Sequence, residues 1–170
     1  VISGRWTFLT WAMVTEGALL AVALIACRLF DQPVSASWSW PDLTLSIFAT
    51  AALLLLFMIL LRTSAAPLRR IREILERVLR PLIRNCHWLE LAAVSIAAGV
   101  GEEWLFRGFL QGELASHIGS IPAIVLASIA FGFCHYITRT YFILATVLGA
   151  AFGWLYFATN NLLVVIVIHA

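Results

Sequence analysis

The chain has 170 residues, of which 62% are hydrophobic and only 12% are charged. Together with a mean hydropathy of +0.97, this composition excludes an ordinary soluble fold and predicts an integral membrane protein. The formal net charge is +2, and all 11 basic residues are arginine. Seven of them fall within residues 62–84, between apolar stretches. This placement fits orientation by the positive-inside rule and argues against nucleic-acid binding.

The first apolar segment covers residues 6–30, which is long enough as a helix to cross a hydrocarbon core of ~30 Å. Glu16 lies near its middle, either as a partnered structural carboxylate or as a group that faces a functional site. A loop rich in Pro, Ser and Asp follows, and Asp42 at its end can cap the next helix. The second apolar segment, residues 43–61, carries no side chain with evident chemistry.

Residues 67–84 have the sequence PLRRIREILERVLRPLIR, in which apolar residues recur at helical spacing. These apolar residues are Ile71, Leu75, Val78 and Leu82. The remaining positions are mostly arginine and glutamate. We therefore expect a basic amphipathic helix on the membrane surface, on the cytoplasmic side. The alternative is a plain solvated connector.

The third apolar segment begins at Trp88 and continues into residues 99–112, GVGEEWLFRGFLQG. Ionisable groups at bilayer depth cost at least ~2.5 kcal/mol each on insertion scales, so Glu102, Glu103 and Arg107 together suggest a function. Glu103 and Arg107 lie one helical turn apart and can form an ion pair. Glu102 is turned away from that pair and is available for acid–base chemistry. Alternatively, both glutamates share Arg107 or face a polar seam between helices.

Three more apolar segments complete the chain. The fourth, residues 121–137, contains FGFCH and places His135 near its end. The fifth covers residues 141–157, in which glycines spaced four apart predict tight helix packing. The sixth starts at Asn161 and contains His169. A lone histidine in such a segment is more often a hydrogen-bonded core residue than a catalyst.

Three ionisable landmarks thus stand on separate predicted helices: EEWLFR from Glu102, FGFCH ending at His135, and His169. In this order they resemble the E-E-x-x-x-R, F-x-x-x-H and H-x-x-x-N/D motifs of the CPBP family. This is the CAAX protease and bacteriocin-processing family, also called Abi, and it includes the Ras-converting CAAX endopeptidases. The resemblance covers roughly residues 88–170. The Asn or Asp of the third motif would fall beyond Ala170, so we expect the native chain to continue and supply it.

The resemblance implies intramembrane hydrolysis of peptide bonds, in eukaryotic members after a prenylated cysteine. Glu102 would be the carboxylate that activates water together with His135, and His169 would belong to the pair that stabilises the oxyanion. Glu103 and Arg107 match the remaining motif positions and would support this geometry. The expected partners are the lipid bilayer and a peptide or protein substrate, without a cofactor. Zinc held by Glu102, His135 and His169 is the alternative, because Glu and His are competent zinc ligands.

These observations predict an all-α fold: a polytopic transmembrane helix bundle of about six hydrophobic segments, the last truncated, with one amphipathic surface helix. Residues 1–61 should form an N-terminal transmembrane hairpin, residues 62–87 an Arg-rich amphipathic connector, and residues 88–170 a C-terminally incomplete catalytic core. The expected location is a prokaryotic plasma membrane, with residues 62–87 in the cytoplasm.

One difficulty concerns depth in the membrane. If straight membrane-spanning helices alternate in direction, Glu102 lies about 21 Å from the cytoplasmic face of the membrane, counting from Trp88. His135 then lies much nearer that face. The two side chains would not meet. We therefore expect a helix break near Gly99 or Gly101, or a membrane-spanning part that starts later.

The rival to an intramembrane endopeptidase is a non-catalytic membrane protein, such as a bacteriocin-immunity or scaffold factor. In that case the polar cluster would only hold helices together. Geometry distinguishes the two, because an endopeptidase requires Glu102, His135 and His169 to converge around a water-accessible cavity.

Overall fold

The computed structural model describes residues 2–170, with side chains from residue 4 onward. These residues form eight α-helices and one π-helix, and no strand occurs among them. The predicted all-α class is therefore confirmed. In chain order the helices are α1 (Ile2–Leu29), α2 (Trp40–Arg62), α3 (Ala66–Ile83), α4 (Trp88–Glu103), η1 (Trp104–Gln111), α5 (Gly112–Ile118), α6 (Ser120–Cys134), α7 (Arg139–Thr159) and α8 (Leu162–His169).

Three of the described helices are long and apolar enough to cross a membrane, namely Gly4–Leu29, Trp40–Arg62 and Arg139–Thr159. They match the first, second and fifth predicted segments. By contrast, α4 has 16 residues, α6 has 15 and α8 has 8, each fewer than the roughly 20 that a helix needs to span a bilayer alone. The expected count of six spans is therefore not confirmed.

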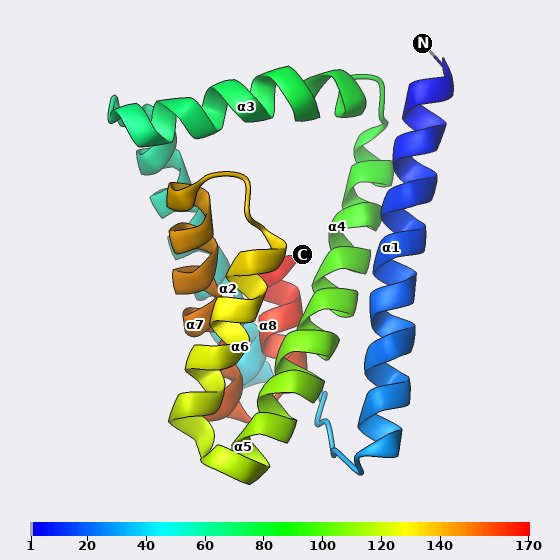
Figure 1. Cartoon of the computed structure of the whole chain (residues 1–170), viewed down its shortest axis with the longest axis vertical. Helices are drawn as coiled ribbons and strands as arrows, with labels where there is room; N and C mark the ends of the chain where they lie inside the picture. The colour runs from blue at the N-terminus through cyan, green and yellow to red at the C-terminus, as the bar shows by residue number, and fades with distance from the viewer. Residues whose placement is uncertain (1) are drawn as a thin grey trace.

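Helix α3 lies across one end of the bundle, between the end of α2 and the beginning of α4 (Figure 1). Arg72 holds its first half in place by donating hydrogen bonds to the carbonyl oxygens of Leu61 and, at 3.1 Å, of Thr63. Ile71 is buried, whereas Val78 and Leu82 are exposed. The predicted helix is thus present, and its attachment to the membrane surface stays a prediction.

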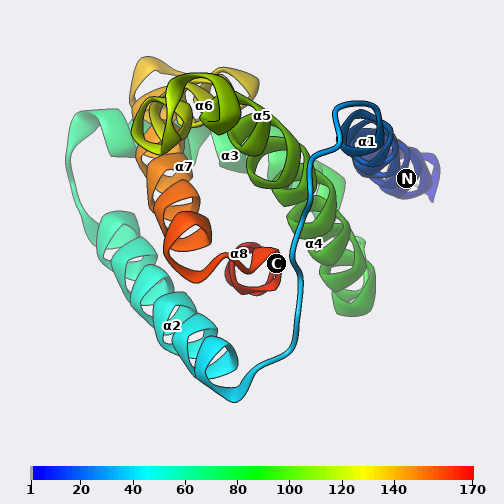
Figure 2. The same cartoon turned by 90° about the horizontal axis from the view of Figure 1, so that it is seen from below.

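Helix α8 is short but lies at the centre of the bundle, between α2, α4 and α7 (Figure 2). Its residues LLVVIVI have no polar face, which is typical of a helix buried on all sides. Leu162 and Val165 have no exposed surface. They pack against Phe152 and Tyr156 of α7. This burial fixes the helix that carries His169.

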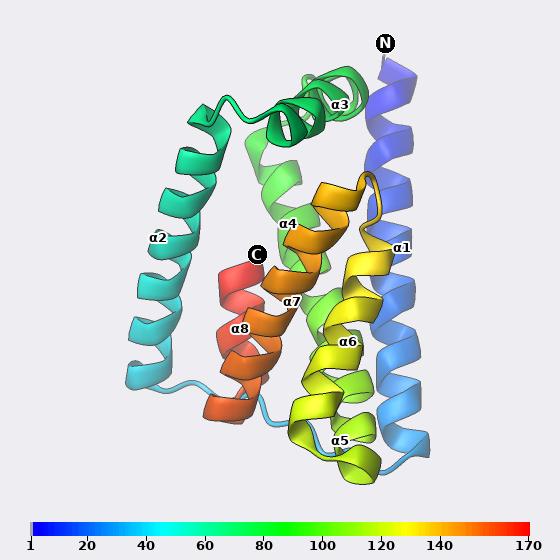
Figure 3. The same ribbon diagram turned by 60° about the vertical axis from the view of Figure 1, so that its left-hand side comes forward.

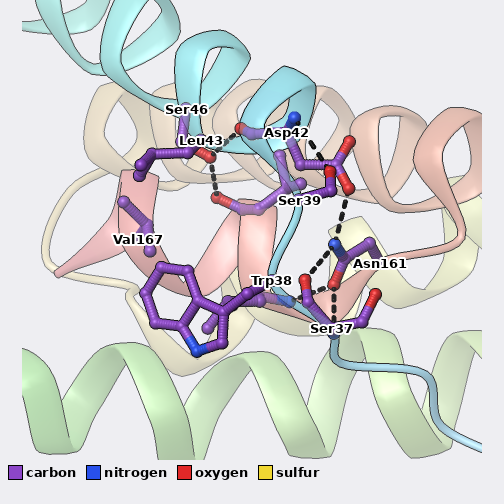
Figure 4. A pocket seen from close by; sticks show the side chains of 10 residues that line it. Ser37, Trp38, Ser39, Asp42, Leu43, Ser46, Asn161 and Val167 are labelled. Atoms are coloured by element: carbon purple, nitrogen blue, oxygen red, sulfur yellow. Dashed lines mark hydrogen bonds between the residues drawn. The ribbon is translucent and has the colours of Figure 1, made fainter.

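Asn161 ties the start of α8 to the loop before α2 (Figure 4). Its side chain accepts a hydrogen bond from Leu163 N at 3.1 Å and donates to Asp42 Oδ2 at 2.7 Å. It also bonds both the N–H and the carbonyl of Ser37. The expected cap of α2 was wrong, because Ser39 is the N-cap and Asp42 lies in the first turn. Asp42 serves instead to hold α8.

Glu102 and His135 reach the same level because α6 is short, and not because α4 is broken. Gly99 and Gly101 lie inside a continuous helix, so a break there, the first of the two alternatives, is wrong. The second alternative, a membrane-spanning part that starts later, stays a prediction. Helix α6, with 15 residues, is only about 22 Å long. It ends part-way up the bundle, and the chain then continues to the start of α7 (Figure 3). His135, directly after α6, therefore reaches the level at which α4 meets η1.

Candidate active site

Glu103 and Arg107 form a buried ion pair where α4 passes into η1. Arg107 Nη1 donates to Glu103 Oε1 at 2.9 Å, and the two side chains are 1% and 0% exposed. Arg107 Nη2 also donates to the carbonyl oxygen of Gly149 at 3.1 Å. Its guanidinium lies 4.5 Å from the ring centroid of Phe131 and 5.4 Å from that of Phe152. The predicted pair of residues one turn apart is confirmed, and hydrogen bonds and aromatic faces stabilise its buried cation.

A second side chain of η1, four residues after Arg107, also donates a hydrogen bond to a backbone carbonyl of α7. Gln111 Nε2 donates to the carbonyl oxygen of Gly153 at 3.0 Å. A Cβ at Gly153 would lie only 2.6 Å from Gln111 Oε1, so the absence of a side chain lets Gln111 reach the α7 backbone. The two glycines were predicted only to permit close packing. We missed that Arg107 and Gln111 are four residues apart, as are Gly149 and Gly153. This equal spacing lets each side chain of η1 reach the carbonyl of one glycine.

Glu102 points away from this pair and meets His135. Glu102 Oε2 lies 3.5 Å from His135 Nε2, and the side chains are 13% and 27% exposed, respectively. His135 Nδ1 lies 2.9 Å from the carbonyl oxygen of Phe131. Because a carbonyl only accepts, Nδ1 carries a hydrogen, and in the neutral ring Nε2 presents its lone pair towards Glu102. The Phe131 ring, 4.3 Å away between centroids, supports the imidazole.

His169 binds Glu103 and not Glu102. Its Nδ1 lies 2.7 Å from Glu103 Oε1, so this oxygen accepts hydrogen bonds from both Arg107 and His169. Glu103 Oε2 is buried and has no hydrogen-bond partner. The imidazole lies at the edge of the site and is 19% exposed. Glu103 therefore links the buried arginine to a partly accessible histidine.

Glu16 on α1 also belongs to this cluster. Helix α1 approaches α4 so closely that a Cβ at Gly101 would lie 2.7 Å from the backbone oxygen of Glu16. Glu16 Oε2 is buried and has no hydrogen-bond partner. The carboxylate interacts electrostatically with Glu102, His169 and His135. Of the two alternatives for Glu16, the structure favours a group that faces the site.

The sequence matches the model of a known protein family. The family model for Type II CAAX prenyl endopeptidase Rce1-like proteins covers residues 84–170. The chain belongs to this family. No curated protein and no solved structure matched the chain. The match confirms the resemblance to the CPBP family, and the chain is an integral membrane protein of a protease family.

Four ionisable residues of this Rce1-like chain therefore converge from three elements. Glu102 and Glu103 come from α4, His135 follows α6, and His169 ends α8. Glu102, His135 and His169 thus lie in one region, which is one half of the geometric test for an endopeptidase; the water-accessible cavity that forms the other half stays a prediction. Glu16 comes from α1 and lies outside the matched residues 84–170.

The alternative zinc site was tested by the same geometry. Within residues 4–170, no group of three or more His, Cys, Asp or Glu side chains is arranged to hold a metal ion. Glu102 and His135 face each other, but His169 turns its Nδ1 to Glu103. The residues present therefore do not fit the alternative zinc ligand set of Glu102, His135 and His169.

The expected wet cavity around the site stays a prediction. Glu102 Oε2 is itself buried. A cavity of about 640 Å³ is lined by residues 136–140 and by Ala66, Pro67 and Arg70. Its lining begins one residue after His135, so it adjoins the histidine along the chain without including it.

Proposed function

We propose that this chain is an intramembrane endopeptidase in which Glu102 and His135 activate water to hydrolyse a peptide bond of a membrane-associated substrate. The observation that carries the proposal is the approach of Glu102 Oε2 to His135 Nε2 at 3.5 Å, in a chain of a protease family. In this proposal residues 88–170 form the catalytic core, and α1 adds Glu16 to it.

Glu102 and His135 can each accept a hydrogen bond, and their accepting atoms lie close together. Glu102 Oε2 has no hydrogen-bond partner, and the hydrogen on His135 Nδ1 leaves Nε2 as a second acceptor. A water molecule that donates one hydrogen to each would be held and activated for attack.

The water oxygen attacks the carbonyl carbon of the scissile bond, and Glu102 takes the proton that the water loses. The resulting tetrahedral intermediate carries its negative charge on the former carbonyl oxygen. When the C–N bond breaks, the proton passes to the leaving nitrogen, with His135 sharing the transfer. The products are a peptide carboxylic acid and an amine, and transfer of the acid proton to the amine gives the carboxylate and the ammonium.

His169 is proposed to stabilise the oxyanion. Because its Nδ1–H donates to Glu103 Oε1 at 2.7 Å, donation from Nε2 requires the doubly protonated ring, with Glu103 as its counter-ion. Arg107 holds Glu103 from the other side at 2.9 Å. The two residues would thus orient His169, and preorganised donors of this kind typically contribute ~2.7 to 4 kcal/mol to transition-state stabilisation.

The proposed substrate is a CAAX-type protein cleaved after a prenylated cysteine, as the name of the family suggests. The test is incubation of the purified protein in detergent with a farnesylated peptide ending in a CAAX sequence, followed by mass spectrometry of the products. The same peptide without the lipid is the control. Cleavage of the farnesylated peptide at the cysteine supports the proposal. Failure to cleave either peptide, by folded protein, would favour the non-catalytic alternative.

The proposed orientation places α3 and residues 62–87 in the cytoplasm of a prokaryotic cell, because arginine is concentrated there. Cys86 lies within this segment and is half-buried. In a variant that keeps only this cysteine, a membrane-impermeant thiol reagent should label Cys86 in inside-out vesicles and not in intact cells. Labelling in intact cells alone would reverse the orientation.

A further inference from the structure

The charged side chains that line the cavity of about 640 Å³ are all positive. It separates the start of α3 from the connection between α6 and α7, and its lining includes Arg70 and Arg139 but no acidic residue. Neither arginine has a hydrogen-bond or ion-pair partner within residues 4–170. Both are exposed. Two cations therefore face one space without a counter-ion.

Neighbouring arginines on α3 differ in this respect. Arg69 lies 3.8 Å from Glu73, and Arg72 donates to the carbonyl oxygens of Leu61 and Thr63. Arg72 also fixes the first half of α3 against the end of α2. Arg70 thus projects from a segment that is held in position, and it is free to bind a ligand.

Two helix starts add to the positive potential of the cavity. Helix α3 begins at Ala66 and α7 begins at Arg139, and both residues line the cavity. Neither helix has an acidic residue in its first turn. The N-terminal end of a helix carries a partial positive charge, so an arginine as the first residue of α7 is unfavourable there. An anion in the cavity would offset both the helix ends and the two side chains.

The position of the cavity identifies the anion. Helix α3 lies across the end of α2 (Figure 1), and α2 is long enough to span the membrane. The cavity at the start of α3 therefore lies at the level of the lipid headgroups. Its volume falls within the range of small-molecule sites, and paired arginines suit the oxygens of a phosphate. We propose that this cavity binds the phosphate of an anionic phospholipid headgroup. The binding does not depend on the proposed peptidase activity.

The test measures lipid binding by the purified full chain in phosphatidylcholine nanodiscs, with and without phosphatidylglycerol, by native mass spectrometry of the protein released from the discs. The cavity variant is Arg70→Gln with Arg139→Gln. The matched control is Arg77→Gln with Arg80→Gln, which removes the same charge from exposed positions of α3 outside the cavity. We expect apparent affinity for phosphatidylglycerol to fall about tenfold or more in the cavity variant and by less than about twofold in the control.

Equal losses in the two variants would overturn the proposal, because they would indicate general attraction to a basic helix. Inorganic phosphate is added in a separate arm in phosphatidylcholine alone. If phosphate saturates the site and phosphatidylglycerol adds nothing, the ligand is a free anion and not a lipid. If the cavity variant loses affinity for a peptide with a free C-terminal carboxylate but not for the lipid, the occupant is the substrate.

A second variant keeps the test informative if the double variant does not fold. Arg139→Gln alone removes a cation from a helix start, so in phosphatidylcholine its unfolding temperature should equal or exceed that of the wild type. In phosphatidylglycerol the order should reverse, because only the wild type gains the full stabilisation from the ligand. An unchanged order in both lipids contradicts the proposal.

Discussion

Replacing Glu103 by glutamine should destabilise the protein strongly. The side chains of Glu103 and Arg107 are 0% and 1% exposed, so Arg107 would remain as a buried cation without its counter-ion. Removing one partner of a buried ion pair costs ~3 to 5 kcal/mol. The amide oxygen of Gln can still accept from Arg107 and His169, and the bond from Arg107 to Gly149 is unaffected, so we expect the lower half of that range. Glu102→Gln is the matched control, because Glu102 has no such partner and its change should cost less than about 1 kcal/mol.

The assay is thermal unfolding in detergent, followed by circular dichroism, with a double variant to separate charge from shape. Adding Arg107→Met to Glu103→Gln removes the orphaned cation and should recover part of the loss, since apolar replacement of a whole buried pair is often neutral. If Glu103→Gln unfolds at the wild-type temperature, the pair does not hold the α4–η1 junction and the reasoning is refuted.

Three further variants test the elements that position the site. Gly101→Ala should lower the unfolding temperature, because its Cβ would lie 2.7 Å from the backbone oxygen of Glu16. Gly17→Ala should not lower it, because a Cβ there would meet nothing within 4 Å. Equal effects of the two variants would contradict the close contact of α1 with α4. Asn161→Ala should cost about 1 to 2 kcal/mol through loss of the α8 cap and should also slow peptide cleavage, and an unchanged cleavage rate would show that α8 does not depend on this cap. Glu16→Gln removes a negative charge beside Glu102, so thermal unfolding should match or exceed that of the wild type; a clear fall would identify Glu16 as a partnered structural carboxylate instead.

Local spacing was sufficient to predict part of the site. Residues four apart on a helix share a face, and this predicted the pair of Glu103 and Arg107 that the structure contains. The same rule predicted that the Glu102 side chain points away from this pair. The meeting of Glu102 with His135, however, was expected from the order of motifs, because spacing within one helix says nothing about a residue on another.

The missed features depend on contacts between distant segments. The end of α6 at Cys134 brings His135 level with Glu102, whereas straight spans led us to expect a break in α4 or a later start of its membrane-spanning part. The hydrogen bonds of Asn161 to residues 37 and 42 cross more than 100 positions in sequence. The π-helix at Trp104–Gln111 was likewise not predicted from the sequence, and such helices occur often at functional sites.

The central claim, that Glu102 activates water, is tested most directly by the rate of peptide cleavage by Glu102→Gln. The variant keeps the shape of the side chain and removes its basic oxygen, so the unfolding temperature should match that of the wild type while cleavage falls by about 10²-fold or more. A strong chelator should leave the wild-type rate unchanged. Wild-type cleavage by folded Glu102→Gln protein, or a rate that the chelator abolishes and zinc restores, would contradict the mechanism.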